Sequence, residues 1–199
     1  MKKYLLITCL LILALGLEAQ SKNPAFVQYI EKYKDLAIRQ QIKYNVPAAI
    51  TMAQGLLESS AGTSELATTA NNHFGIKCTS DWQGRTVTKD DDKAGECFRC
   101  YANINDSYED HSLFLRRKRY ESLFALPLAD YKGWAHGLKA CGYATDPSYP
   151  EKLIRLIELY DLQALTFDKN LLAGGFVSEG DTTWSEPQSD IIAHAAQGG

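Results

Sequence analysis

A single acidic residue closes an apolar helical stretch of this chain, at a position suited to proton transfer. Residues 47–58 begin with Pro47, which favours a first helical position, and continue with apolar side chains on nearly every face. Glu58 comes last, just before the serines and glycine that end the helix. A carboxyl group there is partly removed from water and faces the negative end of the helix dipole, and both effects raise its pKa. Glu58 is therefore a candidate general acid, although a surface glutamate in a last helical turn fits this local pattern equally well.

The elements that must position Glu58 form a mainly α fold with one small inserted β-lobe. Periodicity, caps and stop residues indicate helices at residues 24–45, 47–58, 64–69, 107–118, 131–141 and 149–160. Asn23 caps the first of these, Asp130 caps the fifth, and Gly142 ends the fifth. Asp106 and Glu109 form a capping box for the fourth of these. Short β-prone runs separated by turn-rich stretches occupy residues 74–78, 86–88 and 97–101. The lobe therefore follows the helix that carries Glu58, in a hairpin-like arrangement.

The two ends of the chain differ in composition from its middle. Residues 1–19 have a basic start, a short apolar run and a small residue at the end, which is typical of a signal peptide cleaved after Ala19. No second long apolar run follows, so we expect an exported, periplasmic or secreted protein without an integral membrane segment. Residues 166–199 are acidic and rich in glycine, as in a disordered tail. The intervening domain, residues 20–165, balances its charges and lacks the basic footprint that nucleic-acid binding requires.

Four cysteines remain once the leader is removed, and an even number in an exported chain favours two disulfides. Cys97 and Cys100 fall on opposite faces of one strand, so each is expected to pair elsewhere. Of the three possible pairings we favour Cys78 with Cys97, and Cys100 with Cys141. A zinc site is the competing interpretation, but only one pair has the C-x-x-C spacing, so we predict no metal.

Several strings along the chain, taken together, point to one family. In order, they are AQGLLESSAGTSELA, NNHFGIK, WQGRTV, ECFRCY, DSYEDHSLFL and CGYATDPSY followed by KLIRLIELY. The chain resembles the bacterial glucosaminidases of glycoside hydrolase family 73, within the lysozyme-like superfamily, over residues 26–165. The resemblance implies an endo-β-N-acetylglucosaminidase that hydrolyses the β-1,4 bond between N-acetylglucosamine and N-acetylmuramic acid in peptidoglycan glycan strands. We expect it to act as a monomer without a cofactor.

The resemblance also assigns site residues. Glu58 falls on the family's general acid, and Tyr143, in the string YATD, on a tyrosine near the reaction centre. The second carboxylate of the family lies in the β-lobe, where Asp91 is our choice and the alternatives are Asp90, Asp92 and Glu96. Aromatic faces stack on sugar rings, although each such residue also suits a core. The candidates for substrate binding are Asn72, Phe74, Tyr101 and Tyr149.

Two rival functions share the expected fold. A lytic transglycosylase would use a single glutamate, and a catalytically silent module would only bind or assemble on the cell wall. The YATD and FRCY strings argue against the first, and the presence of both Glu58 and Tyr143 argues against the second. The residues alone do not choose between water activated by a lobe carboxylate and assistance by the substrate's own N-acetyl group.

Overall fold

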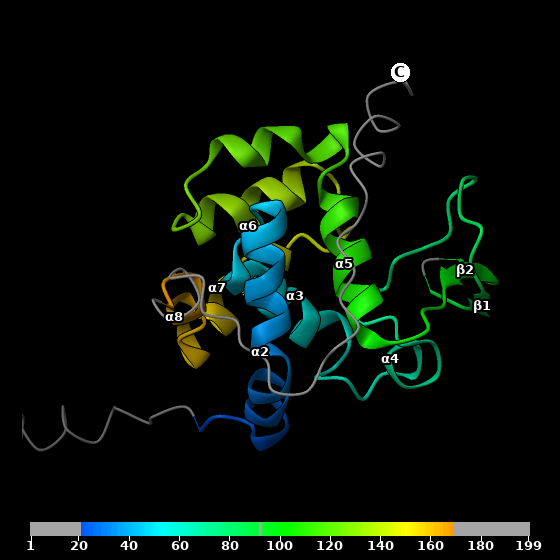
Figure 1. The fold of residues 1–199 in the computed structure, drawn as a ribbon, viewed down its shortest axis with the longest axis horizontal. Helices are drawn as coiled ribbons and strands as arrows, with labels where there is room; N and C mark the ends of the chain where they lie inside the picture. The colour runs from blue at the N-terminus through cyan, green and yellow to red at the C-terminus, as the bar shows by residue number, and fades with distance from the viewer. Residues whose placement is uncertain (1–20, 92, 169–199) are drawn as a thin grey trace, which may run out of the picture. The chain divides into compact units, whose positions relative to one another are not determined.

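A computed structural model describes residues 21–91 and 93–168, and it confirms a mainly helical fold with a two-stranded lobe (Figure 1). The predicted leader and residues 169–199 of the predicted tail lie outside the described residues. The elements are α2 (Pro24–Tyr44), α3 (Ala48–Glu58), α4 (Glu65–Ala70), β1 (Thr86–Lys89), β2 (Glu96–Arg99), α5 (Ile104–Leu115), the 3₁₀ helix η1 (Lys118–Ala125), α6 (Tyr131–Ala140), α7 (Tyr149–Tyr160) and α8 (Gln163–Thr166).

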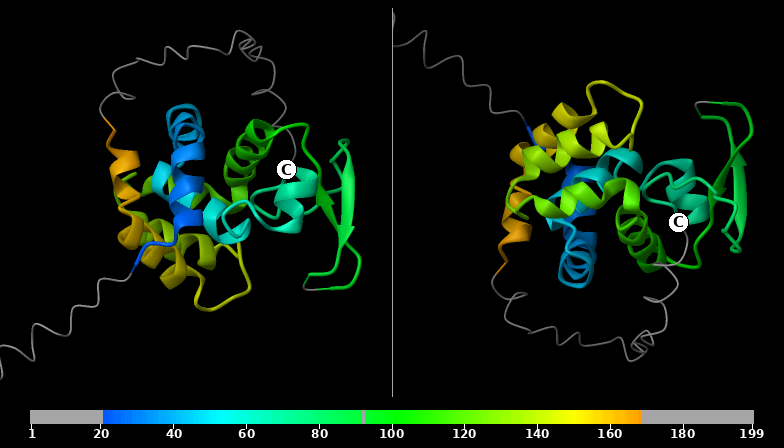
Figure 2. Two further views of the ribbon diagram at one scale, coloured as in Figure 1. Left: turned by 90° about the horizontal axis from the view of Figure 1, so that it is seen from below. Right: turned by 90° about the horizontal axis from the view of Figure 1, so that it is seen from above.

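Helix α3 is the central element of the helical part. All its residues from Ala48 to Leu56 are buried, because α2, α6, α7 and α8 pack around it (Figures 1 and 2). Gly55 lets the Tyr29 side chain of α2 pack directly on α3, since a Cβ atom at this position would lie 2.7 Å from the hydroxyl oxygen of Tyr29. The helix that ends in Glu58 is therefore held from several sides, which gives its last residue a rigid base.

Caps predicted from local sequence are mostly confirmed. Asn23 caps α2 by accepting a hydrogen bond from the N–H of Ala25, and Asp130 caps α6 in the same way. Pro47 is the cap of α3 rather than its first residue. The 3₁₀ helix η1 and the short helix α8 were not predicted.

The capping box expected at the start of α5 is wrong. The structure begins α5 earlier, at an Asn103 cap whose side chain accepts from the N–H of Asp106 at 3.0 Å. Glu109 points instead to α2, where Lys43 lies 2.6 Å from its carboxylate. A tertiary ion pair has thus replaced the local bond that the sequence pattern suggested.

The β-lobe contains two antiparallel strands and not the three predicted runs. Thr86 pairs with Arg99, and Lys89 with Glu96 at the other end. The run 74–78 is no strand: only one bridge joins it to β2, and its Gly75 takes a positive φ of 61°. The physical reason is the side chain of Asn72, which replaces strand pairing here. Its oxygen accepts from the N–H of Ile76, and its nitrogen donates to the carbonyls of Ile76 and Arg99.

A largely buried ion pair anchors this lobe to α5. Both oxygens of Asp110 lie 2.9 Å from Nη1 of Arg99, whose side chain is only 4% exposed. Tyr101 donates to the same carboxylate at 2.6 Å, and Trp82 covers the guanidinium with its ring. A buried ion pair is stable only when its hydrogen bonds are formed, so the contact between Arg99 and Asp110 fixes the position of the lobe relative to α5.

One of the two favoured disulfides forms and the other does not. Cys78 and Cys97 are bonded and join the 74–78 segment to β2. Cys100 and Cys141 are free thiols in the structure, so the second pairing is wrong. The reason is tertiary: Cys141 ends α6, which lies on the opposite side of α5 from the hairpin (Figures 1 and 2).

The helical domain continues slightly beyond its predicted end at residue 165. Thr166 is buried in α8, where its carbonyl accepts from Gln41 at 3.0 Å and its hydroxyl accepts from the N–H of Ala49. No helix within residues 21–91 and 93–168 has both the length and the apolar character needed to cross a bilayer.

Candidate active site

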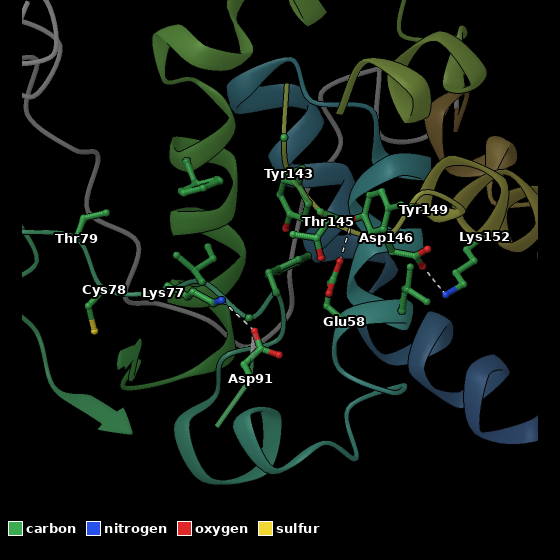
Figure 3. A pocket seen from close by; sticks show the side chains of 17 residues that line it. Glu58, Lys77, Cys78, Thr79, Asp91, Tyr143, Thr145, Asp146, Tyr149 and Lys152 are labelled. Atoms are coloured by element: carbon green, nitrogen blue, oxygen red, sulfur yellow. Dashed lines mark hydrogen bonds and ion pairs between the residues drawn. The ribbon is translucent and has the colours of Figure 1, made fainter. Parts of the chain in front are cut away.

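A cleft of about 500 Å³ opens at the end of α3, between the helices and the β-lobe (Figure 3). Figure 3 shows Glu58 below the rings of Tyr143 and Tyr149, with Asp91 and Lys77 on the facing side. Five of the predicted site residues line the cleft, namely Glu58, Phe74, Asp91, Tyr143 and Tyr149. Residues far apart in the chain thus line the same cleft.

Glu58 is the last residue of α3 and its carboxyl group is largely desolvated. Burial raises its pKa to about 7; the hydrogen bond from Tyr149 opposes the rise, the negative charge of Asp91 adds to it, and Lys152 opposes it. A carboxyl group with this pKa is partly protonated at neutral pH and gives up its proton readily, as a general acid must.

Tyr149 holds that carboxyl group in place. It lies at the start of α7, is 3% exposed, and donates from its hydroxyl to Oε1 of Glu58 at 2.9 Å. Its hydroxyl oxygen accepts from Nε2 of Gln54, also at 2.9 Å. The residue we predicted as a sugar contact is therefore, first of all, a neighbour of the candidate acid.

Tyr143 lies beside Tyr149 in the loop between α6 and α7. Gly142 turns the chain there with a φ of 75°, and the two tyrosine rings stack with their centroids 5.8 Å apart. The hydroxyl of Tyr143 is buried and has no hydrogen-bond partner among the residues that the structure describes. A buried hydroxyl without a partner is unusual, and this one belongs to a residue that lines the cleft.

The hairpin acids take different positions. Asp91 lines the cleft with its side chain 52% exposed, and Lys77 lies 3.0 Å from its carboxylate. Asp90 accepts from the N–H of Gly95 and holds the turn, while Glu96 pairs with Lys77 at 2.8 Å. Asp92 lies outside the described residues. The structure thus places Asp91 opposite Glu58, and Asp90 and Glu96 in the hairpin itself.

Two predicted substrate contacts do not line the cleft. Asn72 is 1% exposed and uses its side chain to hold the 72–76 turn, and Tyr101 is buried against Asp110. Phe74 does line the cleft but is 3% exposed and stacks on the ring of His111. We therefore assign Asn72 and Tyr101 to the framework of the lobe.

Several lining residues were not predicted. Lys152 stands three residues after Tyr149 on α7, a spacing that could have identified it, and lies 2.5 Å from the carboxylate of Asp146. Lys77 ends the string NNHFGIK and contacts both Asp91 and Glu96. Within the described part of the chain, no three His, Cys, Asp or Glu side chains gather as metal ligands.

A desolvated carboxyl group on a central helix, facing a second carboxylate across a cleft beside a β-lobe, is the arrangement of a lysozyme-like glycosidase. Residues 34–162 match the glucosaminidase family, described as mannosyl-glycoprotein endo-beta-N-acetylglucosaminidase. The chain belongs to this family, which confirms the resemblance seen in its sequence strings.

Individual relatives agree with that membership. The chain is 36% identical over 170 residues to the exo-glucosaminidase LytG of Bacillus subtilis (strain 168), covering 74% of this chain and 58% of LytG. It is 31% identical over 144 residues to the peptidoglycan hydrolase FlgJ of Vibrio parahaemolyticus, covering 66% of this chain and 46% of FlgJ. The chain therefore spans only about half the length of these relatives.

Solved structures show the same fold. The catalytic domain of the autolysin Auto from Listeria monocytogenes is 29% identical with a TM-score of 0.62, covering 73% of this chain and 89% of that one. The glycoside hydrolase domain of FlgJ from Salmonella typhimurium is 26% identical with a TM-score of 0.57, covering 75% and 96%.

Proposed function

We propose that this protein is an exported peptidoglycan hydrolase, an endo-β-N-acetylglucosaminidase that cleaves the β-1,4 bond between N-acetylglucosamine and N-acetylmuramic acid. The observation that carries the proposal is Glu58, a desolvated carboxyl group with a pKa of about 7 that shares a cleft with Asp91. Relatives named as an exo-glucosaminidase and as peptidoglycan hydrolases support the substrate class.

Glu58 protonates the glycosidic oxygen as the bond to the anomeric carbon breaks. Positive charge then develops on the sugar ring, and the carboxylate of Asp91 stabilises it from the other side of the cleft. Water adds its oxygen to the anomeric carbon, and its proton passes to a carboxylate, so that one bond is broken and one water consumed. Tyr143 lines the same cleft beside Glu58, and its ring can contact the bound sugar.

Two features support export. The first nineteen residues have the basic start, apolar run and small cleavage residue of a leader. The disulfide between Cys78 and Cys97 suits an oxidising compartment. Peptidoglycan lies in that compartment, so the location and the substrate agree.

The test compares wild type with Glu58→Gln on purified peptidoglycan. Glutamine keeps an oxygen that accepts from Tyr149 but has no proton to transfer, so we expect activity to fall by about 10²- to 10⁴-fold with an unchanged circular dichroism spectrum. Glu31→Gln is the matched control, because this glutamate is exposed on α2 and does not line the cleft, so the variant should keep full activity.

Mass spectrometry of the products identifies the bond and the reaction. New N-acetylglucosamine at reducing ends supports the proposal. Anhydromuramyl ends would indicate a lytic transglycosylase, and release of single terminal sugars only would indicate exo cleavage. Full activity of the folded Glu58→Gln variant would refute Glu58 as the acid.

A further inference from the structure

Gln54 lies on α3 one turn before Glu58, is completely buried, and donates to the hydroxyl of Tyr149. We propose that His111, Gln54 and Tyr149 form a buried hydrogen-bond relay that positions the Glu58 carboxyl group and leaves its Oε2 atom to carry the proton given to the substrate. This inference deepens the proposed function and rests on Glu58 being the acid.

The relay joins three helices through the core. Nε2 of His111, from α5, lies 3.1 Å from Oε1 of Gln54 on α3. Nε2 of Gln54 lies 2.9 Å from the Tyr149 hydroxyl on α7, which lies 2.9 Å from Oε1 of Glu58. His111 and Gln54 are completely buried and Tyr149 is 3% exposed, so water does not compete for these bonds.

The chemistry of the groups sets the direction of every bond. An amide nitrogen only donates, so the oxygen of Tyr149 accepts from Gln54, and the single proton of Tyr149 points to Glu58. An amide oxygen only accepts, so His111 must carry its proton on Nε2. His111 Nδ1 has no partner among the described residues, and burial lowers the pKa of this histidine to about 3, which agrees with a neutral ring protonated on Nε2 alone.

This direction has a consequence at the carboxyl group. Oε1 of Glu58 is occupied as an acceptor, so a proton bound by the neutral acid sits on Oε2. After that proton leaves, Tyr149 still donates to the new carboxylate and stabilises it. The relay therefore orients the Glu58 carboxyl group and stabilises the carboxylate that forms from it. Gln54 acts as a positioning residue through Tyr149.

Other charged and titratable groups also face Glu58. They are Lys152 on α7, Tyr143 and Asp146 in the loop before α7, Asp91 in the hairpin turn, and Lys77 before the hairpin. None of these belongs to the relay, so removing a relay residue leaves their charges in place. A change in the titration of Glu58 upon such a substitution reports the relay itself.

The experiment measures kcat/KM on peptidoglycan fragments against pH for wild type, Tyr149→Phe and Gln54→Met. Loss of the Tyr149 hydroxyl removes a hydrogen bond to the Glu58 carboxylate, so the pKa of Glu58 rises. We expect the basic limb of the Tyr149→Phe profile to move up by about one pH unit, with kcat at least about tenfold lower. Gln54→Met should shift the limb in the same direction by less, because Tyr149 keeps its hydroxyl.

Tyr29→Phe is the matched control. Tyr29 is also a buried tyrosine packed against α3, and its hydroxyl bonds to His73 and Tyr108 rather than to the relay. The same loss of one buried hydroxyl should leave the pH profile unchanged, whatever it does to stability.

Carbon-13 NMR titration of the Glu58 carboxyl group gives the same answer without turnover, so a variant of low activity remains informative. An unmoved basic limb and an unmoved carboxyl titration in folded Tyr149→Phe would overturn the relay. If Glu58→Gln is inactive while Tyr149→Phe titrates like wild type, only the relay fails. If Glu58→Gln keeps full activity, the proposed function itself fails.

Discussion

The desolvated Glu58 side chain should make this protein less stable as the pH rises, and Glu58→Gln should remove that effect. The pKa of Glu58 is raised in the folded state from 4.5 to about 7. As pH rises between these values, the unfolded chain releases this proton while the folded protein keeps it, so the free energy of unfolding falls. The favourable contribution is complete below the unfolded pKa and is lost as pH passes through the folded pKa.

The size of the effect follows from the shift. At 1.36 kcal/mol for each pKa unit, a rise from 4.5 to about 7 corresponds to about 3 kcal/mol lost above neutral pH. A glutamine side chain does not ionise and is free of this penalty. Glu58→Gln should therefore match wild type at about pH 5 and exceed it by about 2 to 3 kcal/mol at about pH 8.

Urea unfolding followed by tryptophan fluorescence measures this difference, because Trp134 is completely buried in the core. Glu31→Gln is the control, since its side chain is 65% exposed and its stability should stay within about 0.5 kcal/mol of wild type at both pH values. A stability gain of the same size at both pH values would refute the desolvation of Glu58.

Three further variants test the surroundings of the site. Asp91→Asn removes a negative charge that raises the pKa of Glu58, so the basic limb of the pH–activity profile should move to lower pH; a shift to higher pH would contradict this. Asp110→Ala leaves a buried guanidinium unpaired and should cost about 3 kcal/mol in urea unfolding, and a cost below about 1 kcal/mol would count against the anchor. The double variant Cys78→Ser, Cys97→Ser lacks the disulfide that closes a loop with a sequence separation of 19, so its free energy of unfolding should fall by about 3 kcal/mol. Wild type under reducing conditions should lose the same amount.

Local sequence was a good guide wherever neighbouring residues decide the structure. The cap at Asn23, the cap at Asp130 and the turn at Gly142 each depend on contacts within a few residues, and all were predicted correctly. The start of α5 was mispredicted, because Asn103 offers an earlier cap and Glu109 bonds to another helix.

The sequence predicted some residues of the site correctly and others wrongly. Aromatic residues near the strings of the family suit both a sugar groove and a core, and only packing separates the two: Tyr149 reached the cleft and Tyr101 was buried against Asp110. Local sequence does not separate the acidic residues of the hairpin, and among the three that the structure describes, Asp90, Asp91 and Glu96, only Asp91 lines the cleft.

By itself the sequence determined the helical framework, the family and the place of Glu58 at the end of an apolar helix, because these depend on periodicity, caps and residue order. The tertiary structure decided what surrounds that carboxyl group. Tyr149 and Glu58 are separated by most of the domain in the chain, yet the packing of α7 on α3 brings them within 2.9 Å. Desolvation and directed hydrogen bonds depend on such long-range packing, and they convert an ordinary glutamate into a candidate acid.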